Sequence, residues 1–193
     1  MAFSSLLSKY SATANDHGTD KTTVHSYGDL YDATFEECRS KADVCVLEIG
    51  IYSGAFLQAV AEFLPEAQVD GIDVSLDRVR FGRSNPRIRM ACLDGTAAAS
   101  VEALQRSYDV IIDDASHLPA DQVRTLDLFA PLLKPGGVYM IEDINDATME
   151  EVRREVTTLA DRHGLELAWH DLRDRKGRYD DIMAVLRRPA QGA

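Results

Sequence analysis

The chain has 193 residues, of which 45% are hydrophobic, and a formal net charge of −11 from 32 acidic and 21 basic side chains. This length allows one domain with a sizeable core and leaves little room for a second. The acidic balance opposes binding to a polyanion, so we expect no nucleic-acid partner.

We expect a single domain over residues 1–193, with a loop and a helix at 1–43, a core at 44–188 and a tail at 189–193. The N-terminus carries neither a basic leader nor a long apolar run, and the longest apolar runs have the length of strands. This predicts a soluble, cytoplasmic protein with no membrane partner. The cysteines lack C-x-x-C spacing and are expected to be buried reduced thiols: Cys38, Cys45 and Cys92.

A short polar motif, His17-Gly18-Thr19-Asp20-Lys21, predicts a loop near the N-terminus. Aromatic and apolar residues then fall on one face of a helix: Tyr27, Tyr31, Phe35 and Cys38. Two interpretations of the loop stay open. Lys21 is able to pair with a carboxylate of a bound ligand while His25 reaches a substrate. Alternatively, the loop is solvated and Asp20 caps a turn.

Residues 44–54 predict a buried strand, a glycine turn and the start of a helix. The run V-C-V-L-E-I is β-branched and aliphatic, is too short for a buried helix, and ends at Gly50. From Ser53 onward, apolar residues recur at helical spacing until Pro65. In a doubly wound sheet such a turn lies at the carboxyl edge, where backbone N–H groups and a helix N-terminus meet a ligand.

The spacing of this turn, Glu48-x-Gly50-x-x-x-Gly54, differs from the dinucleotide pattern G-x-G-x-x-G. A carboxylate at the end of the strand would repel a pyrophosphate, but not a cationic ligand without phosphate such as S-adenosylmethionine (SAM). The missing third glycine therefore disfavours a nicotinamide oxidoreductase. The alternative is that Gly50 and Gly54 only form a tight turn.

A second strand is expected over 69–73 and ends in Asp73, which is placed to accept both ribose hydroxyls of an adenosine ligand. A helix is expected over 75–82. A third strand over 88–92 leads to Asp94-Gly95 at the same edge, where Asp94 either accepts the adenine amino group or forms an ordinary turn. The five arginines of this region are expected on a solvated helix face and loop: Arg78, Arg80, Arg83, Arg87 and Arg89.

Four further strands complete the sheet, at 108–112, 138–141, 165–169 and 182–186, with helices at 122–133 and 150–163. The last two strands have no helix between them, which predicts an antiparallel pair at one edge. The expected fold is α/β and Rossmann-like: a seven-stranded, mostly parallel sheet with one antiparallel strand and helices on both faces.

Acidic residues follow two neighbouring strands, in Asp113-Asp114 and Glu142-Asp143. Parallel neighbours end about 5 Å apart, so these carboxylates can converge and would repel one another. A hard divalent cation such as Mg²⁺ relieves that repulsion with oxygen ligands. In the alternative reading, the first pair caps a helix and the second begins a solvated loop. His117 lies close enough to share an acceptor with Asp114, and an imidazole with a pKa near 6.5 is able to take its proton.

Five motifs together resemble one family: H-G-T-D-K, V-L-E-I-G-I-x-x-G, G-I-D-V, I-I-D-D-x-S-H and P-G-G-x-Y-x-I-E-D. They are similar to those of class I SAM-dependent methyltransferases, and among these to the metal-dependent O-methyltransferases that modify deoxysugars on macrolide and related antibiotics, the mycinamicin sugar methyltransferase type. The similarity runs from His17 to Asp143. The spacing from Asp114 to Glu142 is also similar to the metal-ligand spacing of catechol O-methyltransferases.

The resemblance implies that Asp114, Glu142 and Asp143 are Mg²⁺ ligands and that His117 is the general base. It also implies that Glu48, Gly50 and Asp73 bind SAM. With the residues singled out above, the set expected at SAM is Thr19, Lys21, Glu48, Gly50, Gly54, Asp73, Asp94, Gly95 and Asp113. The chain departs from the family at Ala115, where glycine is more common, and at residues 144–147, which replace an aromatic and hydroxyl-rich stretch.

We therefore expect a SAM- and Mg²⁺-dependent O-methyltransferase that acts on a hydroxyl of a small molecule, with a sugar of a secondary metabolite or antibiotic as the first interpretation. A catechol-like phenol is the alternative acceptor. A noncatalytic SAM-binding protein is a third interpretation, which the acid cluster disfavours. A homo-oligomer is compatible with the sequence.

Overall fold

A seven-stranded sheet forms the centre of the described chain, residues 1–11 and 18–190 of the computed structural model. Its strands are β1 (Cys45–Ile49), β2 (Gln68–Asp73), β3 (Ile88–Cys92), β4 (Tyr108–Asp113), β5 (Leu133–Ile141), β6 (Glu166–Asp171) and β7 (Ile182–Arg187). They lie in the order β3-β2-β1-β4-β5-β7-β6. Only β7 runs antiparallel to its neighbours, β5 and β6. The predicted fold class is confirmed. His17 and residues 191–193 lie outside the described residues.

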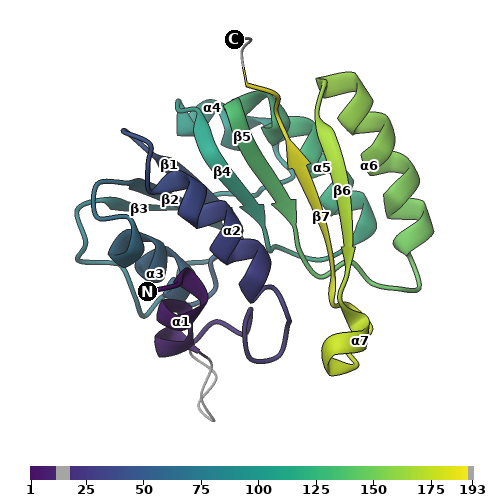
Figure 1. Cartoon of the computed structure of the whole chain (residues 1–193). Helices are drawn as coiled ribbons and strands as arrows, with labels where there is room; N and C mark the ends of the chain where they lie inside the picture. The colour runs from purple at the N-terminus through teal and green to yellow at the C-terminus, as the bar shows by residue number, and fades with distance from the viewer. Residues whose placement is uncertain (12–17, 191–193) are drawn as a thin grey trace.

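Helices cover both faces of this sheet (Figure 1). On one face lie α1 (Phe3–Leu7), α2 (Gly28–Cys38) and α3 (Ala55–Phe63), and on the other α4 (Ala98–Leu104), α5 (Pro119–Phe129) and α6 (Met149–His163). A short α7 (Arg173–Lys176) connects β6 to β7, and two 3₁₀ turns occupy Ser8–Tyr10 and Ala130–Leu132. Alternate strand residues feed the two cores: Val110 and Ile112 face one, and Ile111 faces the other.

The N-terminal helices pack tightly on the sheet. The ring of Phe3 lies 4.4 Å from that of Phe35 and 5.7 Å from that of Phe56, so α1, α2 and α3 share one aromatic cluster. Aromatic pairs of this kind add to the free energy gained from apolar burial. The segment before residue 44 is thereby fixed against the core, which matters for the site below. The organisation of residues 1–193 as one domain stays a prediction.

The predicted helix over 75–82 is wrong. The backbone N–H groups of Arg80 and Phe81 donate to the Ser53 carbonyl, at 2.8 and 3.0 Å, instead of to carbonyls one turn back. Gly82 then takes a positive φ of 79°. This tertiary pairing outweighs the local preference for a helix. A helix that the pattern did not predict, α4, forms instead after β3.

Two of the arginines expected on a solvated surface have structural partners. Arg89 binds Asp70 with two nitrogens, at 3.1 and 2.9 Å, and Arg87 donates to three carbonyls at the end of α3 and beyond it. The expectation of three buried thiols is also wrong. Cys38 is buried, but Cys45 is half-buried and Cys92 is exposed; all three are free.

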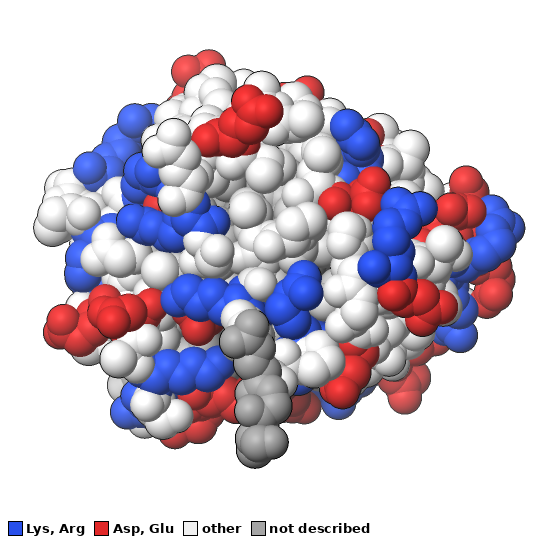
Figure 2. All heavy atoms as spheres, turned by 90° about the horizontal axis from the view of Figure 1, so that it is seen from above, with Lys and Arg blue, Asp and Glu red and all other residues white. Residues whose placement is uncertain are grey.

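The surface carries no continuous charge of one sign on the face seen in Figure 2, where basic and acidic side chains of the described chain alternate around a mostly uncharged centre. None of the helices in the described part of the chain is both long and apolar enough to cross a membrane. The mixed charge of this face offers no extended positive surface to a polyanion.

At Gly50, the turn after β1 packs closely against the segment after β4. It has a φ of 88°, and a Cβ added there would lie 2.6 Å from the carbonyl carbon of Asp114 and 2.7 Å from the Cα of Ala115. The Asp114 N–H donates to the Ile49 carbonyl at 2.9 Å, which keeps the two segments in contact. Only glycine combines this dihedral angle with this close approach.

We predict that Gly50→Ala lowers the free energy of unfolding by about 3 kcal/mol or more, because it adds a backbone overlap to the cost of a left-handed residue, about 1–2 kcal/mol. Gly164→Ala is the matched control: its φ is 64°, and a Cβ there meets no atom within 4 Å. Its free energy of unfolding should fall only by the cost of the left-handed φ. Urea unfolding measures both values, and equal losses would contradict the account.

Candidate active site

A cleft of about 570 Å³ opens at the carboxyl ends of the central strands. Its size suits a nucleoside-sized ligand. It is lined by nine of the residues predicted to bind SAM or Mg²⁺ or to act as the base: Thr19, Lys21, Glu48, Gly50, Asp73, Asp94, Gly95, Asp114 and His117. The cleft therefore lies where a ligand is expected in an open α/β sheet, beyond the strand ends and against the first glycine turn.

Asp73 holds the glycine turn as well as lining the cleft. Its Oδ2 accepts hydrogen bonds from the N–H groups of Ile51 and Tyr52, both at 3.0 Å, and its Oδ1 accepts one from Ser75 at 3.1 Å. The sequence indicated a ligand-binding acid here but not its structural role. A carboxylate offers about four lone-pair sites, and Oδ1 of Asp73 accepts only one of these hydrogen bonds, so bracing the turn and accepting a ligand hydroxyl through Oδ1 are compatible.

Three buried polar atoms of residues that line the cleft have no hydrogen-bond partner among the described residues: Glu48 Oε2, Thr19 Oγ1 and His117 Nδ1. Glu48 is 2% exposed, and burial raises the pKa of its carboxyl to about 8, although Lys21 acts in the opposite direction. A buried acceptor without a partner costs free energy that a ligand donor recovers on binding. Glu48 Oε2 and Thr19 Oγ1 therefore mark a part of the cleft that is ready for a polar ligand.

Asp94 and Gly95 lie at the rim of the cleft. Asp94 is exposed, and its Oδ1 accepts hydrogen bonds from the N–H and the hydroxyl of Thr96, at 2.8 and 2.7 Å. These bonds lower the pKa of Asp94. Asp94 therefore forms an ordinary turn at the rim of the cleft, and its contact with an adenine amino group stays a prediction.

Two residues expected at the cofactor do not line the cleft. Asp113 is buried behind it, where Thr125 donates a hydrogen bond to Oδ2 and burial raises the pKa of the carboxyl to about 7. Gly54 precedes α3 with a φ of 79°, and a Cβ there would lie 2.8 Å from the Phe81 carbonyl oxygen. Gly54 is thus required by the packing of the turn.

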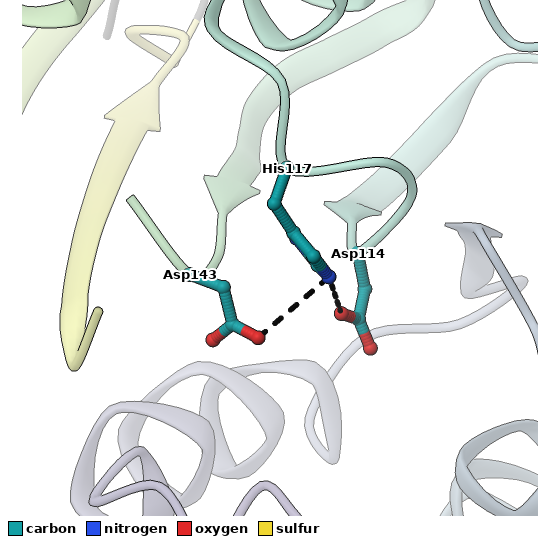
Figure 3. Close-up of side chains that lie close together, drawn as sticks. All are labelled: Asp114, His117 and Asp143. Carbon is teal, nitrogen blue, oxygen red and sulfur yellow. Dashed lines mark ion pairs between the residues drawn. The ribbon is translucent and has the colours of Figure 1, made fainter. Parts of the chain in front are cut away.

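Carboxylates and an imidazole converge beyond β4 and β5. Asp114 follows β4, and Asp143 follows β5 by one residue. His117 Nε2 lies between them, 3.8 Å from Asp114 Oδ1 and 3.8 Å from Asp143 Oδ2 (Figure 3). One ligand atom from each of the three residues lies within 4.8 Å of the others. His117 and Asp143 have positive φ values of 56° and 53°. Such strain commonly gathers at functional sites.

Lys21 lies inside this acid cluster and is only 2% exposed. It donates hydrogen bonds to Asp114 and, at 2.8 Å, to Glu142 Oε1, and it lies 3.7 Å from Glu48 Oε1. Burial opposes its charge, but the three carboxylates outweigh burial and keep the pKa of Lys21 well above its usual range. The ammonium expected to meet a ligand carboxylate is therefore in contact with acids of the chain itself.

Sequence reasoning missed several partners of the acids. Tyr27 and Tyr31 looked like core residues of a helix face, yet their hydroxyls reach Asp143 and Glu142. His25 is 2% exposed and lies behind Asp143, so it does not face the cleft as expected for contact with a substrate. Only the i, i+4 spacing of Tyr27 and Tyr31, which puts both side chains on one face of the helix, could have indicated that they contact neighbouring acids.

The donor set fits a hard divalent cation. Asp114 and Asp143 offer carboxylate oxygens on adjacent loops. Glu142, the third predicted ligand, is not in this converging group; it is buried and shares the ammonium of Lys21 with Asp114. Carboxylates are the ligands that Mg²⁺ prefers, and it usually keeps several waters. His117 is 38% exposed in its side chain, so its ring is accessible from the cleft. The arrangement is able to bind a cation beside a base.

Comparison with known proteins gives one family and several relatives. Residues 40–181 match the family described as methyltransferase domain. The chain is 32% identical over 138 residues to 8-demethyl-8-alpha-L-rhamnosyl tetracenomycin-C 2'-O-methyltransferase of Streptomyces olivaceus, covering 66% of this chain and 35% of that protein. It is 31% identical over 131 residues to mycinamicin VI 2''-O-methyltransferase of Micromonospora griseorubida, covering 63% and 32%. The chain thus spans about a third of the length of these relatives.

A solved structure shares the fold. It is the MycE methyltransferase from the mycinamycin biosynthetic pathway in complex with Mg, S-adenosylhomocysteine (SAH) and mycinamycin VI, with a TM-score of 0.75 and 21% identity. The match covers 98% of this chain and 54% of that one. The resemblance to sugar O-methyltransferases, inferred above from the motifs, is confirmed by these relatives.

The raised pKa values of buried acids predict that stability falls as pH rises. Glu48 ionises near its ordinary value of 4.5 in the unfolded chain but at about 8 in the folded one, so the free energy of unfolding falls between these pH values. Glu48→Gln should therefore be more stable than the parent by about 2 kcal/mol or more at pH 8, with a smaller difference near pH 5.

Urea unfolding across this pH range measures the difference. Asp94→Asn is the control, because Asp94 is an acid of the same cleft whose pKa is lowered. It should show no gain in stability that grows with pH. Parallel curves for the parent and Glu48→Gln would contradict the prediction.

Proposed function

The chain belongs to the methyltransferase domain family, and from this premise we propose that it transfers a methyl group from SAM to a hydroxyl of a small molecule, assisted by Mg²⁺. We propose a sugar of a secondary metabolite, such as an antibiotic, as the acceptor. The observation that carries the proposal is the convergence of Asp114, His117 and Asp143 at the edge of a cleft that also contains the glycine turn. The names of the relatives support the sugar.

The donor half of the site is assigned to the cleft residues. SAM is a sulfonium that supplies an activated methyl group. Glu48 and Thr19 offer the unpartnered acceptor atoms, Asp73 accepts ribose hydroxyls, and Asp94 faces the adenine end with Gly95. Gly50 gives the backbone its close approach. We assign Lys21 to the acid cluster instead of to SAM, because its ammonium is already bound by carboxylates.

Asp113 and Gly54 are assigned indirect roles. Asp113 braces α5 against β4 through Thr125, and Gly54 allows the turn to pack on residues 80–81. Neither lines the cleft, so replacing either would alter SAM binding through the shape of the turn. This is a different expectation from direct contact with the cofactor.

The acceptor half of the site is assigned to Asp114, Glu142 and Asp143 as the residues that would hold Mg²⁺. A divalent cation held there would lower the pKa of a nearby hydroxyl. The rest of the chemistry falls to the chain. The loops after β4 and β5 fix the direction from which an acceptor enters, and alignment of acceptor oxygen with the methyl group supplies much of the rate enhancement.

His117 is proposed as the general base. Its Nε2 lies between the two aspartates, whose negative charge stabilises the imidazolium formed when Nε2 takes the proton of the acceptor hydroxyl. Its side chain is partly exposed toward the cleft, so an acceptor can reach it. The remaining expectations, a small-molecule partner and no nucleic acid, stay proposals supported by the cleft and by the net charge of −11.

The function is tested by incubating the protein with labelled SAM and panels of glycosides and catechols. We expect methylation of a glycoside, abolished by excess chelator and restored by Mg²⁺, because ionisation of a sugar hydroxyl near neutral pH needs the cation.

Three results would count against the proposal in different ways. Turnover of catechols alone moves the acceptor to the phenol alternative. Undiminished turnover in excess chelator would exclude a role for Mg²⁺ in the reaction. Tight binding of SAH without turnover of any acceptor leaves a noncatalytic SAM-binding protein.

We predict that His117→Ala lowers turnover by about 10² or more while calorimetry still detects binding of SAH, since the variant loses the base but not the cleft. His163→Ala is the control: this histidine lies at the end of α6, where it pairs with Asp127 at 3.0 Å. It should retain turnover. Normal turnover in His117→Ala would assign the proton transfer elsewhere, and a loss of SAH affinity alone would make His117 structural.

A further inference from the structure

We propose that residues 21–31, here called the N-terminal segment, position the acids of the metal site: each carboxylate is held through one oxygen by a donor of this segment, and its other oxygen is left for the cation. The proposal rests on the proposed function, since it takes Asp114, Glu142 and Asp143 as ligands. Its residues are Lys21, Tyr27 and Tyr31, which act through the acids and touch neither the methyl donor nor the acceptor.

The two oxygens of Asp143 have different surroundings. Tyr27 donates its hydroxyl proton to Oδ1 at 2.7 Å, and the same hydroxyl oxygen accepts the N–H of Asp143 at 3.2 Å. His25 Nδ1 lies 3.2 Å from Oδ1 as well. Oδ2, in contrast, faces His117 Nε2 at 3.8 Å (Figure 3). One oxygen is therefore fixed from behind while the other points into the site.

Asp114 follows the same rule, and Glu142 shares its first half, the contact of one oxygen with donors of the N-terminal segment. Lys21 donates to Oδ2 of Asp114, whereas Oδ1 faces His117 Nε2 at 3.8 Å. On Glu142, Lys21 donates to Oε1 at 2.8 Å and Tyr31 donates to the same oxygen. Both contacts to Glu142 thus fall on one oxygen. The donors come from one short stretch of chain, although the three acids come from two different loops.

The donors are rigidly held. Tyr27 and Tyr31 lie one helical turn apart at the start of α2, which matches the adjacent positions of Glu142 and Asp143. Tyr31 packs against Phe56, with ring centroids 5.2 Å apart, and both tyrosines are fully buried. Residues that orient ligands from behind typically contribute 10–100-fold to metal affinity. Tyr27 and Tyr31 also lie before residue 40, where the match to the family begins.

The test measures Mn²⁺ affinity of the full chain by electron paramagnetic resonance, with Tyr27→Phe and Tyr31→Phe compared with Tyr108→Phe. Tyr108 is a matched control, because its hydroxyl donates to the buried carboxylate of Asp70 at the same distance, 2.7 Å, away from the cleft. We expect Mn²⁺ to bind about tenfold or more weakly to Tyr27→Phe and to Tyr31→Phe, and within about twofold of the parent to Tyr108→Phe. SAH binding and urea unfolding are measured on every variant.

A selective loss of Mn²⁺ affinity with retained SAH binding supports the positioning role. If Tyr27→Phe and Tyr31→Phe bind Mn²⁺ as tightly as Tyr108→Phe does, the positioning role is wrong while the metal site stands. If the parent binds no Mn²⁺, the metal part of the proposed function fails and this proposal fails with it. Should one of the two tyrosine variants not fold, the other decides, since each acts on a different acid.

Discussion

Mutual repulsion among closely spaced carboxylates is the constraint on which this site depends. Four acids lie at the ends of three neighbouring strands: Glu48, Asp114, Glu142 and Asp143. Lys21 is buried among them and contacts three. Burial and the neighbouring acids raise the pKa values of Glu48, Glu142 and Asp143, so Lys21 alone does not stabilise the ionised forms of all four acids, and a further cation would favour those forms. Buried charges persist only where partners hold them, and here the N-terminal segment supplies most of those partners.

The same constraint connects the two halves of the cleft. Gly50 lets the turn after β1 pack against the segment that carries Asp114. Lys21 contacts Glu48 on the side of this turn and Asp114 in that segment. A ligand at the glycine turn and a cation at the acid cluster would therefore share one charged, tightly packed wall. Such a wall keeps reacting groups at fixed distances, which is what methyl transfer between two bound partners requires. In this arrangement Glu48 is buried, which raises its pKa and makes its ionised form destabilise the fold.

Much of the fold could be predicted, because strands buried on both faces read as short apolar runs and glycine or proline ends them. The convergence of Asp114 with Asp143 followed from strand order alone. The helix over 75–82 failed because Ser53, distant in sequence, captures the amides of residues 80–81. The contacts of Lys21 and Tyr27 with the acids were not predicted, for a related reason: how a segment packs across a sheet edge is a tertiary property, and a phenol on an apolar helix face does not reveal whether its hydroxyl has a partner.

The most direct test is a crystal structure of the protein with Mn²⁺ and SAH, with the cation located by its anomalous scattering. The account predicts one peak beside Asp114, Glu142 and Asp143, with Tyr27 and Tyr31 on the carboxylate oxygens that face away from the peak, and SAH along the glycine turn. An acid cluster that stays free of metal while SAH is bound, or a cation bound away from these acids, would contradict the account.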